Sequence, residues 1–598
     1  MTKKLFQFKQ IILLLIVNVM YSQTTINYKL SMPEPQSHIY EVEAQFDNLP
    51  KKLKELNFSL PVWRSGRYVV FDFAGDLLTM SVSDSKGKLL KWEKTDKTSW
   101  SVELNSSTSI NIKYKIFANE FNARTKGLNS DHGFVDPSAI FIYAEEYRSL
   151  PLTLIVAPFK NWHVTTGLVE IEKNKFTAPN YDYFTDCPLE IGTQKDFTFM
   201  AEGKEHKISI FGEANYNFDT LKKDFSTLIS YNKNFWGKLP YDNYTFMFHI
   251  TPTAGGATEH INSTILGERA ANFAKRDIYI SSVLGTVSHE YFHTWNVKQL
   301  RPKGIAPYDF LKENYTKELW ISEGTTSYYD DLILVRTKFK TAKSYTDDIA
   351  TKVRNDRRRP GNLNQSLSES SFDAWIKFWK SSFHSYNFQS DYYEKGANVS
   401  LLLDLEIRKI TNNSHSLDNV MKSMFEKFPL EKGGFTVDDF QKNIENLTDH
   451  SFILFFENYI HGTKPLPWEE ILNNVGLVIS VKDSLKEIDL GFTVVDQNGK
   501  AIVRNVIINS SAMSAGLDIQ DEVIALNGQR VNAKEIIEKI TSMNPLTTIK
   551  ITVFREDKIK EISFQPNYQT TPTYVVAKVK APTSLQQKTY ESWLNTTW

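Results

Sequence analysis

Two histidines and a glutamate near the middle of the chain have the types and spacing of a hydrolytic metal site. In HEYFHTWNVKQLRP, His289 and His293 are four residues apart, so on a helix both point from one face and can bind one metal ion. Glu290 lies beside them, where a carboxylate can act as a base. Catalytic zinc also needs a third protein ligand and an open position. Glu323 is the natural candidate, because ELWISEGTTSYYDDLILV has the periodicity of a second helix that can bring it back to the metal.

The surroundings of the motif favour zinc over a chance match. The aromatic residues Phe292 and Trp295 lie in or just after it, and a W-x-x-E-G segment follows on the second predicted helix. Two histidines and a carboxylate can also form the facial triad of iron oxygenases. The adjacent Glu290 and the later helical glutamate fit tetrahedral zinc with a neighbouring base better.

Length and composition restrict the protein class. A chain of 598 residues is too long for one core, so three or more domains are expected. A hydrophobic content of 41%, with 39 Phe and 27 Tyr, indicates well-packed globular domains. The 70 basic and 70 acidic residues cancel, so nothing points to nucleic acid as a partner. The single cysteine, Cys187, cannot form an internal disulfide and is expected to be a small buried residue.

The amino end has the pattern of a secretory signal over residues 1–22. Lysines precede an apolar run over residues 11–17, and Ser22 is a small residue where cleavage could occur. The run is too short for a comfortable membrane span, so no stable span is expected after cleavage. We therefore predict a periplasmic or secreted protein. An uncleaved amino-terminal anchor is the less favoured alternative, because Met20 and Tyr21 make an imperfect cleavage site.

Periodicity divides the remaining chain into regions and predicts a multidomain α+β fold. Residues 25–211 alternate polar and apolar residues in short runs, which predicts a β-sandwich; there Trp63 and Arg64 are expected to tie a strand corner rather than line a cleft. Residues 216–467 are mainly helical, with YDNYTFMFHIT as an adjoining strand. A further domain is predicted over residues 474–566, followed by a tail at 567–598 that folds against the body or is partly disordered.

Two short segments in the helical region could serve a metal site. In GGATEH, residues 255–260, the paired glycines let the backbone approach a ligand and Glu259 brings a charge, although by itself the segment reads as a turn. In YYEKG, residues 392–396, a tyrosine hydroxyl could donate a hydrogen bond to an oxyanion. A tyrosine at a helix start is more often structural.

Taken together, GGATEH, HEYFHTWNVKQLRP, LWISEG with TSYYDDL, and YYEKG resemble the glycyl aminopeptidase family of gluzincin metallopeptidases. The resemblance covers nearly the whole mature chain. PVWRSGRYVVFDFA is similar to that family's amino-terminal β domain, and YIHGTKPLPWEEIL is similar to the end of its mainly helical, thermolysin-like catalytic domain. A PDZ module follows in many members.

The resemblance implies a role for each matching position. One zinc ion per chain is expected, with Glu290 as the general base and Tyr393 as the donor to the oxyanion. Glu259 would hold the free amino group of a peptide, which admits the substrate by its amino end. Gly256 and Ala257 would contact the substrate beside it. The implied zinc ligands are His289, His293 and Glu323.

The segment around Glu259 departs from the family pattern. Members often read G-G-x-E-H, and the gapless match here places Ala257 at the second glycine, as in the alanyl relatives that read G-A-M-E-N. If Gly255 and Gly256 filled both glycine positions, one residue would be inserted and the carboxylate displaced. The gapless register is the favoured one.

The carboxyl-terminal region resembles bacterial-type PDZ domains. LGF, residues Leu490, Gly491 and Phe492, is similar to the carboxylate-binding loop, and SSAMSAGLDIQDEVIALNG follows the PDZ signature. Ser511 and Gln520 replace its usual proline and second glycine. Backbone amides near Gly491 could receive a peptide terminus while the next strand pairs with the peptide. Use of the fold for packing on the catalytic domain is an equal alternative.

These patterns leave three functional hypotheses. The leading one is a zinc aminopeptidase that acts on peptides with a free amino end and favours small residues such as Gly or Ala, as the family name implies. The second is a PDZ-containing scaffold that only binds peptides. The third is a zinc endopeptidase with the same chemistry and an ineffective Glu259.

Overall fold

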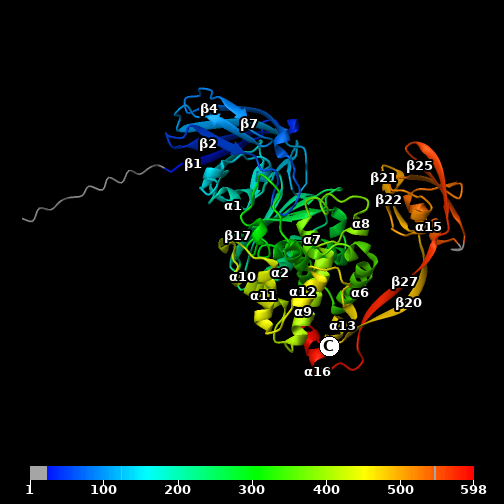
Figure 1. Ribbon diagram of the computed structural model, residues 1–598. Coiled ribbons are helices and arrows are strands. Elements are labelled where there is room, and N and C mark those ends of the chain that lie inside the picture. Colours follow the sequence, from blue (N-terminus) through cyan, green and yellow to red (C-terminus); the bar gives the residue numbers. More distant parts are fainter. Residues whose placement is uncertain (1–22, 123, 544–546) are drawn as a thin grey trace, which may run out of the picture.

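The computed structural model describes residues 23–122, 124–543 and 547–598, although not every side chain in these ranges. The predicted signal segment, residues 1–22, lies outside the described residues. A β-rich region, a large helical region and a small domain carried on a two-stranded arm follow one another along the chain (Figure 1). The predicted multidomain α+β class is confirmed. Among the helices described, none is long and apolar enough to cross a membrane.

The amino-terminal region consists of sheets whose strands bury alternate side chains. β1 (Thr25–Ser31) runs parallel to β10 (Leu152–Ala157) and antiparallel to β2 (Ile39–Asp47) at the centre of a seven-stranded sheet. Its other strands are β4 (Leu77–Asp84), β7 (Ser109–Phe117), β12 (Val169–Glu172) and β13 (Lys175–Ala178). A three-stranded sheet contains β3 (Glu55–Ser59), β5 (Trp92–Lys94) and β6 (Ser99–Glu103), and a four-stranded sheet contains β8 (Lys126–Leu128), β9 (His132–Val135), β11 (His163–Thr166) and β14 (Leu189–Gly192).

The boundary predicted at residue 211 falls inside a sheet. β15 (Lys195–Ala201) and β16 (Lys204–Gly212) do not join the amino-terminal sheets, because β16 pairs in parallel with β17 (Asn243–Ile250) of the catalytic region. The resulting five-stranded sheet has the order β15-β16-β17-β19-β18. It ends at the edge strand β18 (Ala257–Glu259), paired antiparallel with β19 (Ser263–Glu268). The GGATEH segment, read as a turn, therefore contains the edge strand of this sheet.

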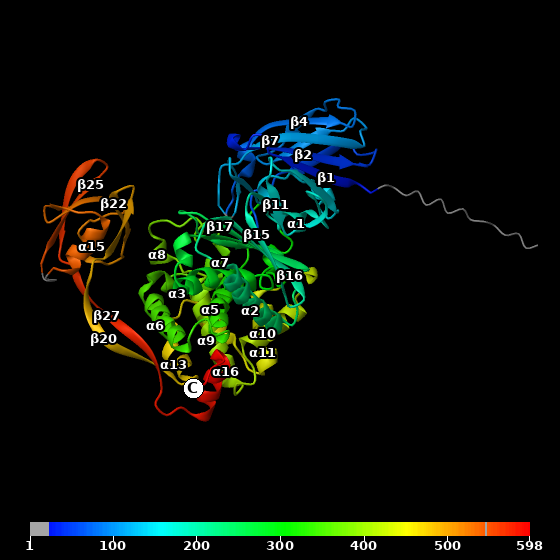
Figure 2. The same cartoon turned by 180° about the vertical axis from the view of Figure 1, so that it is seen from behind.

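Helices fill the rest of the catalytic region. α4 (Gly285–Phe292) and α5 (Thr325–Arg336) pack together in its centre, and the buried helix α9 (Glu394–Ile410) packs against α5. Figure 2 shows α2 beside the strands of the five-stranded sheet, on the same side of the molecule. The other helices are α1 (Tyr181–Thr185), α2 (Phe218–Trp236), α3 (Arg276–Tyr279), α6 (Ala342–Arg358), α7 (Leu367–Phe372), α8 (Ser385–Phe388), α10 (Leu417–Lys427), α11 (Val437–Thr448), α12 (Ile453–Tyr459) and α13 (Trp468–Asn473).

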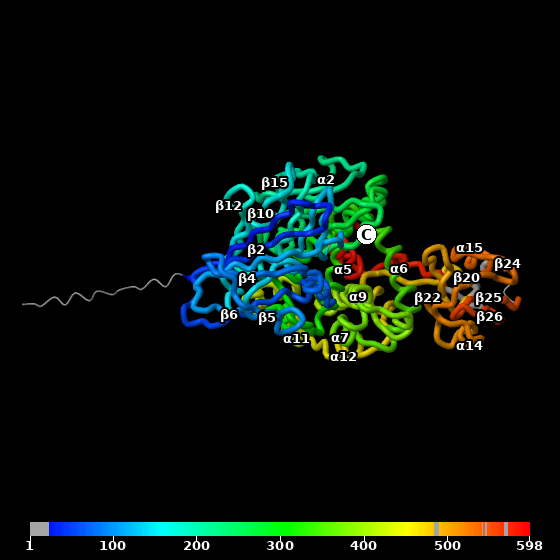
Figure 3. The backbone as a smooth tube through the Cα atoms, turned by 90° about the horizontal axis from the view of Figure 1, so that it is seen from above, coloured from blue at the N-terminus to red at the C-terminus, as the bar shows by residue number. Residues whose placement is uncertain are grey.

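A long β arm joins the PDZ domain to the catalytic region, and the side-chain amide of Asn387 in α8 also donates to the backbone oxygen of Val506 in the PDZ domain at 3.0 Å. β20 (Leu477–Asp489) pairs antiparallel with β27 (Asn567–Lys578), so the arm takes residues from both sides of the domain (Figures 1 and 3). The chain then returns and ends in α16 (Ser584–Leu594), whose Trp593 is fully buried against the catalytic region. Its indole donates to the hydroxyl of Tyr328 at 3.0 Å, so the segment predicted as a tail includes a docked helix.

The PDZ sheet begins after the arm. Its strands are β21 (Phe492–Gln497), β22 (Lys500–Val506), β23 (Glu522–Leu526), β24 (Gln529–Arg530), β25 (Ile549–Arg555) and β26 (Lys558–Phe564), with the helices α14 (Ser511–Ser514) and α15 (Ala533–Thr541). These elements enclose a separate hydrophobic core that includes Val503, Ile536 and Ile551. The PDZ domain therefore has a hydrophobic core of its own, separate from that of the catalytic region.

The loop after β3 joins the amino-terminal region to the catalytic region. The indole of Trp63 donates to the backbone oxygen of Asp309 at 2.6 Å, and Arg64 forms a buried ion pair with Asp136 at 2.6 Å. Both side chains are buried, as expected for residues that secure a corner. The next residues of the same loop, beginning with Gly66, reach the pocket described below.

Candidate active site

A π-helical turn comes directly before each of the two helices at the predicted metal site. α4 follows the π-helical turn η6 (Ile280–Leu284), and α5 follows η8 (Trp320–Gly324), which contains Glu323. Such turns are rare and occur often at functional sites, because they redirect side chains relative to a regular helix. His289 lies on α4, and His293 caps its carboxyl end.

The structure brings the three predicted ligands together. The Nε2 atoms of His289 and His293 are 3.0 Å apart, and Glu323 Oε2 lies 3.7 Å from the first and 3.1 Å from the second. A tetrahedral zinc ion with ligands at about 2.0–2.1 Å separates its ligand atoms by about 3.3 Å. The donor set and its spacing therefore fit zinc.

Hydrogen bonds behind the ligands orient them. His289 Nδ1 lies 2.9 Å from Asp330 Oδ2, and His293 Nδ1 lies 2.8 Å from the backbone oxygen of Asn296. Each bond leaves Nε2 facing the other ligands, an arrangement that also strengthens a histidine as a ligand. The amide of Asn296 donates to the backbone oxygen of Ile321 at 2.9 Å, which ties the end of α4 to the turn that carries Glu323.

The carboxylates of the site have different electrostatic environments. Burial alone would raise the pKa of Glu323, but His293 and His289 hold it at about 2, so this group stays ionised as a ligand should. Burial raises the pKa of Glu290 to about 7, while the two histidines act in the opposite direction. Oε2 of Glu290 is buried without a hydrogen-bond partner among the described residues. Glu290 is therefore placed to exchange a proton near neutrality.

Tyr393 lies at the start of α9 and lines the same pocket. Its ring stacks with that of His289 at 6.4 Å between centroids. Burial raises the pKa of Tyr393 well above its ordinary value, so the hydroxyl keeps its proton and can donate. A Cβ added to Gly324 would come within 2.6 Å of Cα of Gly396, so the glycines of LWISEG and YYEKG let the two helices approach closely enough to place this tyrosine.

Glu259 lies across the pocket from the metal ligands. It is the last residue of β18 and is only 4% exposed. Glu259, Glu290 and His293 present oxygen or nitrogen atoms that all lie within 4.8 Å of one another. The pairing of β18 with β19 is uninterrupted from Ala257 to Glu259.

Residues from distant segments support Glu259. Gly66, with a φ of +85°, packs against it so closely that an added Cβ would lie 2.6 Å from Oε2 of Glu259. Lys298 Nζ lies 3.9 Å from Oε1 of Glu259, but it donates at 2.9 Å to Asp186. The nearest cation is thus largely committed to another carboxylate.

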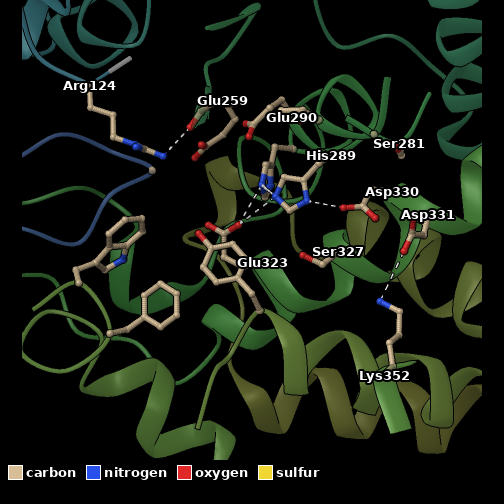
Figure 4. A pocket seen from close by; sticks show the side chains of 18 residues that line it. Arg124, Glu259, Ser281, His289, Glu290, Glu323, Ser327, Asp330, Asp331 and Lys352 are labelled. Carbon is tan, nitrogen blue, oxygen red and sulfur yellow. Dashed lines mark hydrogen bonds and ion pairs between the residues drawn. The ribbon is translucent and has the colours of Figure 1, made fainter. Parts of the chain in front are cut away.

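A pocket of about 700 Å³ joins these groups (Figure 4). Arg124, Glu259 and Glu290 lie toward one end, His289 and Glu323 in the middle, and Asp331 and Lys352 toward the other end. The sequence patterns did not identify several of its lining residues: Gly66, Arg124, Asp330, Lys352, Phe378 and Trp379. Asp330 was within reach, because it lies in TSYYDDL and zinc-bound histidines commonly require a carboxylate partner. Gly66 and Arg124 come from another region and carry no local signal.

The predicted PDZ loop contains a glycine in a left-handed conformation. Gly491 has a φ of +68°, and an added Cβ would lie 2.4 Å from Cβ of Ser510. Leu490 and Phe492 flank it, and Phe492 begins β21. Gln520 has a φ of +67°, which explains why glycine is usual at that position. Leu490, Gly491 and Phe492 do not line the active-site pocket.

Comparisons with known proteins agree with this geometry. Residues 27–193 match the Peptidase M61 N-terminal domain, residues 282–399 match M61 glycyl aminopeptidase, and residues 488–565 match a PDZ domain. The structure is similar to that of an aminopeptidase N family protein from Idiomarina loihiensis, with a TM-score of 0.88 and 25% identity over 95% of this chain and 100% of that chain. An M1 zinc metallopeptidase from Deinococcus radiodurans aligns with a TM-score of 0.43 and 13% identity, over 71% and 90% of the two chains. No curated protein sequence matches the chain.

The fold and the site together define a zinc metallopeptidase with an aminopeptidase architecture. The chain has the domain organisation that the family models describe: an M61 amino-terminal domain, an M61 glycyl aminopeptidase domain and a PDZ domain after them.

Proposed function

We propose that this protein removes amino-terminal residues from peptides, with a preference for small residues such as Gly or Ala, and uses one zinc ion at the site formed by His289, His293 and Glu323. The observation that carries the proposal is the position of Glu259. Its buried carboxylate lies within 4.8 Å of Glu290 and His293, and Lys298, 3.9 Å away, donates to Asp186, so among the described residues no positive charge belongs to Glu259 alone. A substrate ammonium group would supply that charge and fix the peptide by its amino end.

Glu290 acts as the general base in this proposal. Bound zinc would lower the pKa of a water molecule and polarise the scissile carbonyl. Glu290, next to His289 and only 7% exposed, would accept the proton of the attacking water and pass it to the leaving amine. A pKa near neutrality suits a group that must both take and give a proton.

Tyr393 stabilises the charge that forms on the substrate oxygen. Its high pKa keeps the hydroxyl protonated, and a donor fixed in place before the reaction needs no reorganisation when charge develops. The rings of Phe378 and His289, at centroid distances of 5.4 Å and 6.4 Å, hold the tyrosine ring.

The wall beside Glu259 supports the proposed preference for small side chains. The backbone of Gly66 closes on the carboxylate, and Phe378 and Trp379 line the same pocket. A peptide whose ammonium group contacts Glu259 therefore has its first side chain in a space bounded by backbone and rings. Large side chains would have to displace these groups.

The PDZ domain would bind the carboxyl end of a peptide along β21, with the loop Leu490–Phe492 around the terminal carboxylate. The lysines and apolar run of the first 22 residues support a periplasmic or secreted location. Neither feature enters the catalytic chemistry.

The test compares glycyl, alanyl and leucyl anilides with peptides whose amino group is blocked, while zinc is measured in the same sample. We expect chelator-sensitive release from the glycyl and alanyl anilides, slower release from the leucyl anilide, and no cleavage of blocked peptides. Cleavage of blocked peptides would indicate an endopeptidase instead. Bound zinc without cleavage of either kind would indicate a peptide-binding scaffold.

A further inference from the structure

We propose that Arg67 and Arg124, two arginines from loops of the amino-terminal β region, bind a carboxylate group of the substrate at the rim of the active-site pocket. This inference rests on the proposed aminopeptidase function and narrows its substrate class. We refer to these two residues as the arginine pair.

The arginine pair lies around one aromatic ring that lines the pocket. The guanidinium carbon of Arg67 is 5.1 Å from the centroid of the Trp379 ring, and that of Arg124 is 5.6 Å from it. Arg124 also lines the pocket itself, and its Nη2 donates to the backbone oxygen of Ala257 at 2.8 Å. Arg124 is therefore attached to the strand that ends in Glu259.

The charges of the pair lack acidic partners in the part of the chain that the structure describes. Arg64, from the same loop as Arg67, forms a buried ion pair with Asp136 at 2.6 Å. No such pair within 4.0 Å involves Arg67 or Arg124 among the described residues, and the Nε atom of each is buried without a hydrogen-bond partner there. Burial and the nearby charges of Arg124 and Arg64 lower the pKa of Arg67.

The Trp379 ring attracts both cations but neutralises neither. Two guanidinium groups held close together by the fold repel each other, and an anion between them would relieve this repulsion. Guanidinium groups match carboxylates through paired N–H donors, which makes a carboxylate the fitting ligand. A purely structural role for the pair would leave two partly buried charges uncompensated.

The same pocket offers an acidic group and a basic group to one ligand. Glu259 and Arg124 both line it and form no ion pair with each other within 4.0 Å, so neither of these two groups neutralises the other. Figure 4 shows the two side chains at the same end of the pocket. The substrate class is therefore a short peptide with a free ammonium group and a carboxylate within its first residues. The carboxylate can be the peptide's own carboxyl end or an acidic side chain.

The experiment compares kcat/KM within pairs of peptides that differ only in one carboxylate. Gly-Ala and Gly-Ala-Ala are each compared with their carboxyl-terminal amides, and Gly-Asp-Ala-amide is compared with Gly-Asn-Ala-amide. Wild-type protein should prefer the carboxylate member of at least one pair by about tenfold or more, as expected for a hydrogen-bonded charge pair. The pair of peptides that shows the preference identifies the source of the carboxylate.

In the Arg67→Gln and Arg124→Gln variants, the ratio of kcat/KM for the carboxylate peptide to that for its uncharged counterpart should fall toward one. A general loss of activity lowers both values and leaves this ratio unchanged. Arg269→Gln removes the same charge from an exposed position and should keep the wild-type ratio. Wild-type ratios near one for every pair, or ratios unchanged in both variants, would overturn the proposal.

Failure of the proposed aminopeptidase function can be distinguished from failure of the arginine-pair proposal. If the function is wrong, wild-type protein cleaves neither these peptides nor glycyl anilide. In that case calorimetric binding of Gly-Ala and Gly-Ala-amide to the Glu290→Gln variant still tests the pair. Equal affinities for the two ligands would contradict the role assigned to the arginine pair, and tighter binding of Gly-Ala would support it.

Discussion

The two sides of the active-site pocket are built in different ways. On the metal side, His289, Glu290, His293 and Glu323 come from two contiguous motifs on neighbouring helices, α4 and the turn that precedes α5. On the opposite side, the wall consists of an edge strand and segments that are far apart in the sequence. Its residues are Gly66, Arg124, Ala257, Glu259 and Trp379.

This difference separates chemistry from selection. The metal side depends on helical spacing and on bonds between two helices, such as Asn296 to the turn of Glu323. The selecting wall depends on how the amino-terminal region docks on the catalytic sheet. Changes on the metal side should therefore reduce turnover of every substrate, whereas changes in the wall should alter which substrates are accepted.

The largest effect is expected for Glu290→Gln. The amide cannot accept a proton, so kcat should fall by about 10²–10⁴-fold for all substrates while zinc content stays near the wild-type value. Anilide kinetics together with metal analysis check this. If the zinc-loaded variant turned over substrate at the wild-type rate, Glu290 would not be the general base.

Tyr393→Phe should have the next largest effect on activity, because it removes one hydrogen-bond donor to the oxyanion and keeps the ring stacked near His289. We expect a fall of about 10²–10³-fold in kcat, with KM for glycyl anilide little changed. Tyr392→Phe is the neighbouring control, since the Tyr392 hydroxyl accepts from the indole of Trp379 at 3.0 Å. Equal losses in the two variants would argue for a structural role of both tyrosines.

Asp330→Asn tests the support behind the metal ligands. The amide can no longer offer two anionic oxygens to His289 Nδ1, so the zinc dissociation constant should rise by about 10–100-fold. Competition with a chromogenic chelator measures it. Activity should recover when excess zinc is added, and failure to recover would show that Asp330 does more than orient the ligand.

Gly66→Ala tests the wall with the smallest change. At a φ of +85° and with Glu259 Oε2 only 2.6 Å from the new Cβ, the substitution should displace the carboxylate. We expect kcat/KM for glycyl anilide to fall by about tenfold, from the order of 1–3 kcal/mol of strain. Gly87→Ala is the matched control, because Gly87 has a φ of +80° and open space around it. A loss of equal size in both variants would mean that backbone strain alone is responsible.

The same division decides how much the sequence could predict. The positions of His289, His293 and Glu323 followed from spacing within short segments, and the β-rich region and the PDZ domain followed from strand alternation and a loop signature. Gly66 and Arg124 could not be found in this way, because they are far from Glu259 in the sequence and no local pattern indicates that the fold brings them near it. The parallel pairing of β16 with β17 also joins distant segments, so no sequence pattern indicated that the predicted boundary at residue 211 falls inside this sheet. The three-residue strand β18 is too short for an alternation signal.

The central claim is that Glu259 selects the amino end of the substrate while the metal side performs the chemistry. The most direct test is the ratio of kcat/KM for a glycyl peptide with a free amino group to that of the same peptide with a blocked one, measured for wild-type protein and for Glu259→Gln at equal zinc content. The wild-type ratio should be high, and it should fall by about tenfold or more in the variant, because a buried carboxylate no longer pairs with the ammonium group. An unchanged ratio in a zinc-loaded variant would contradict the claim.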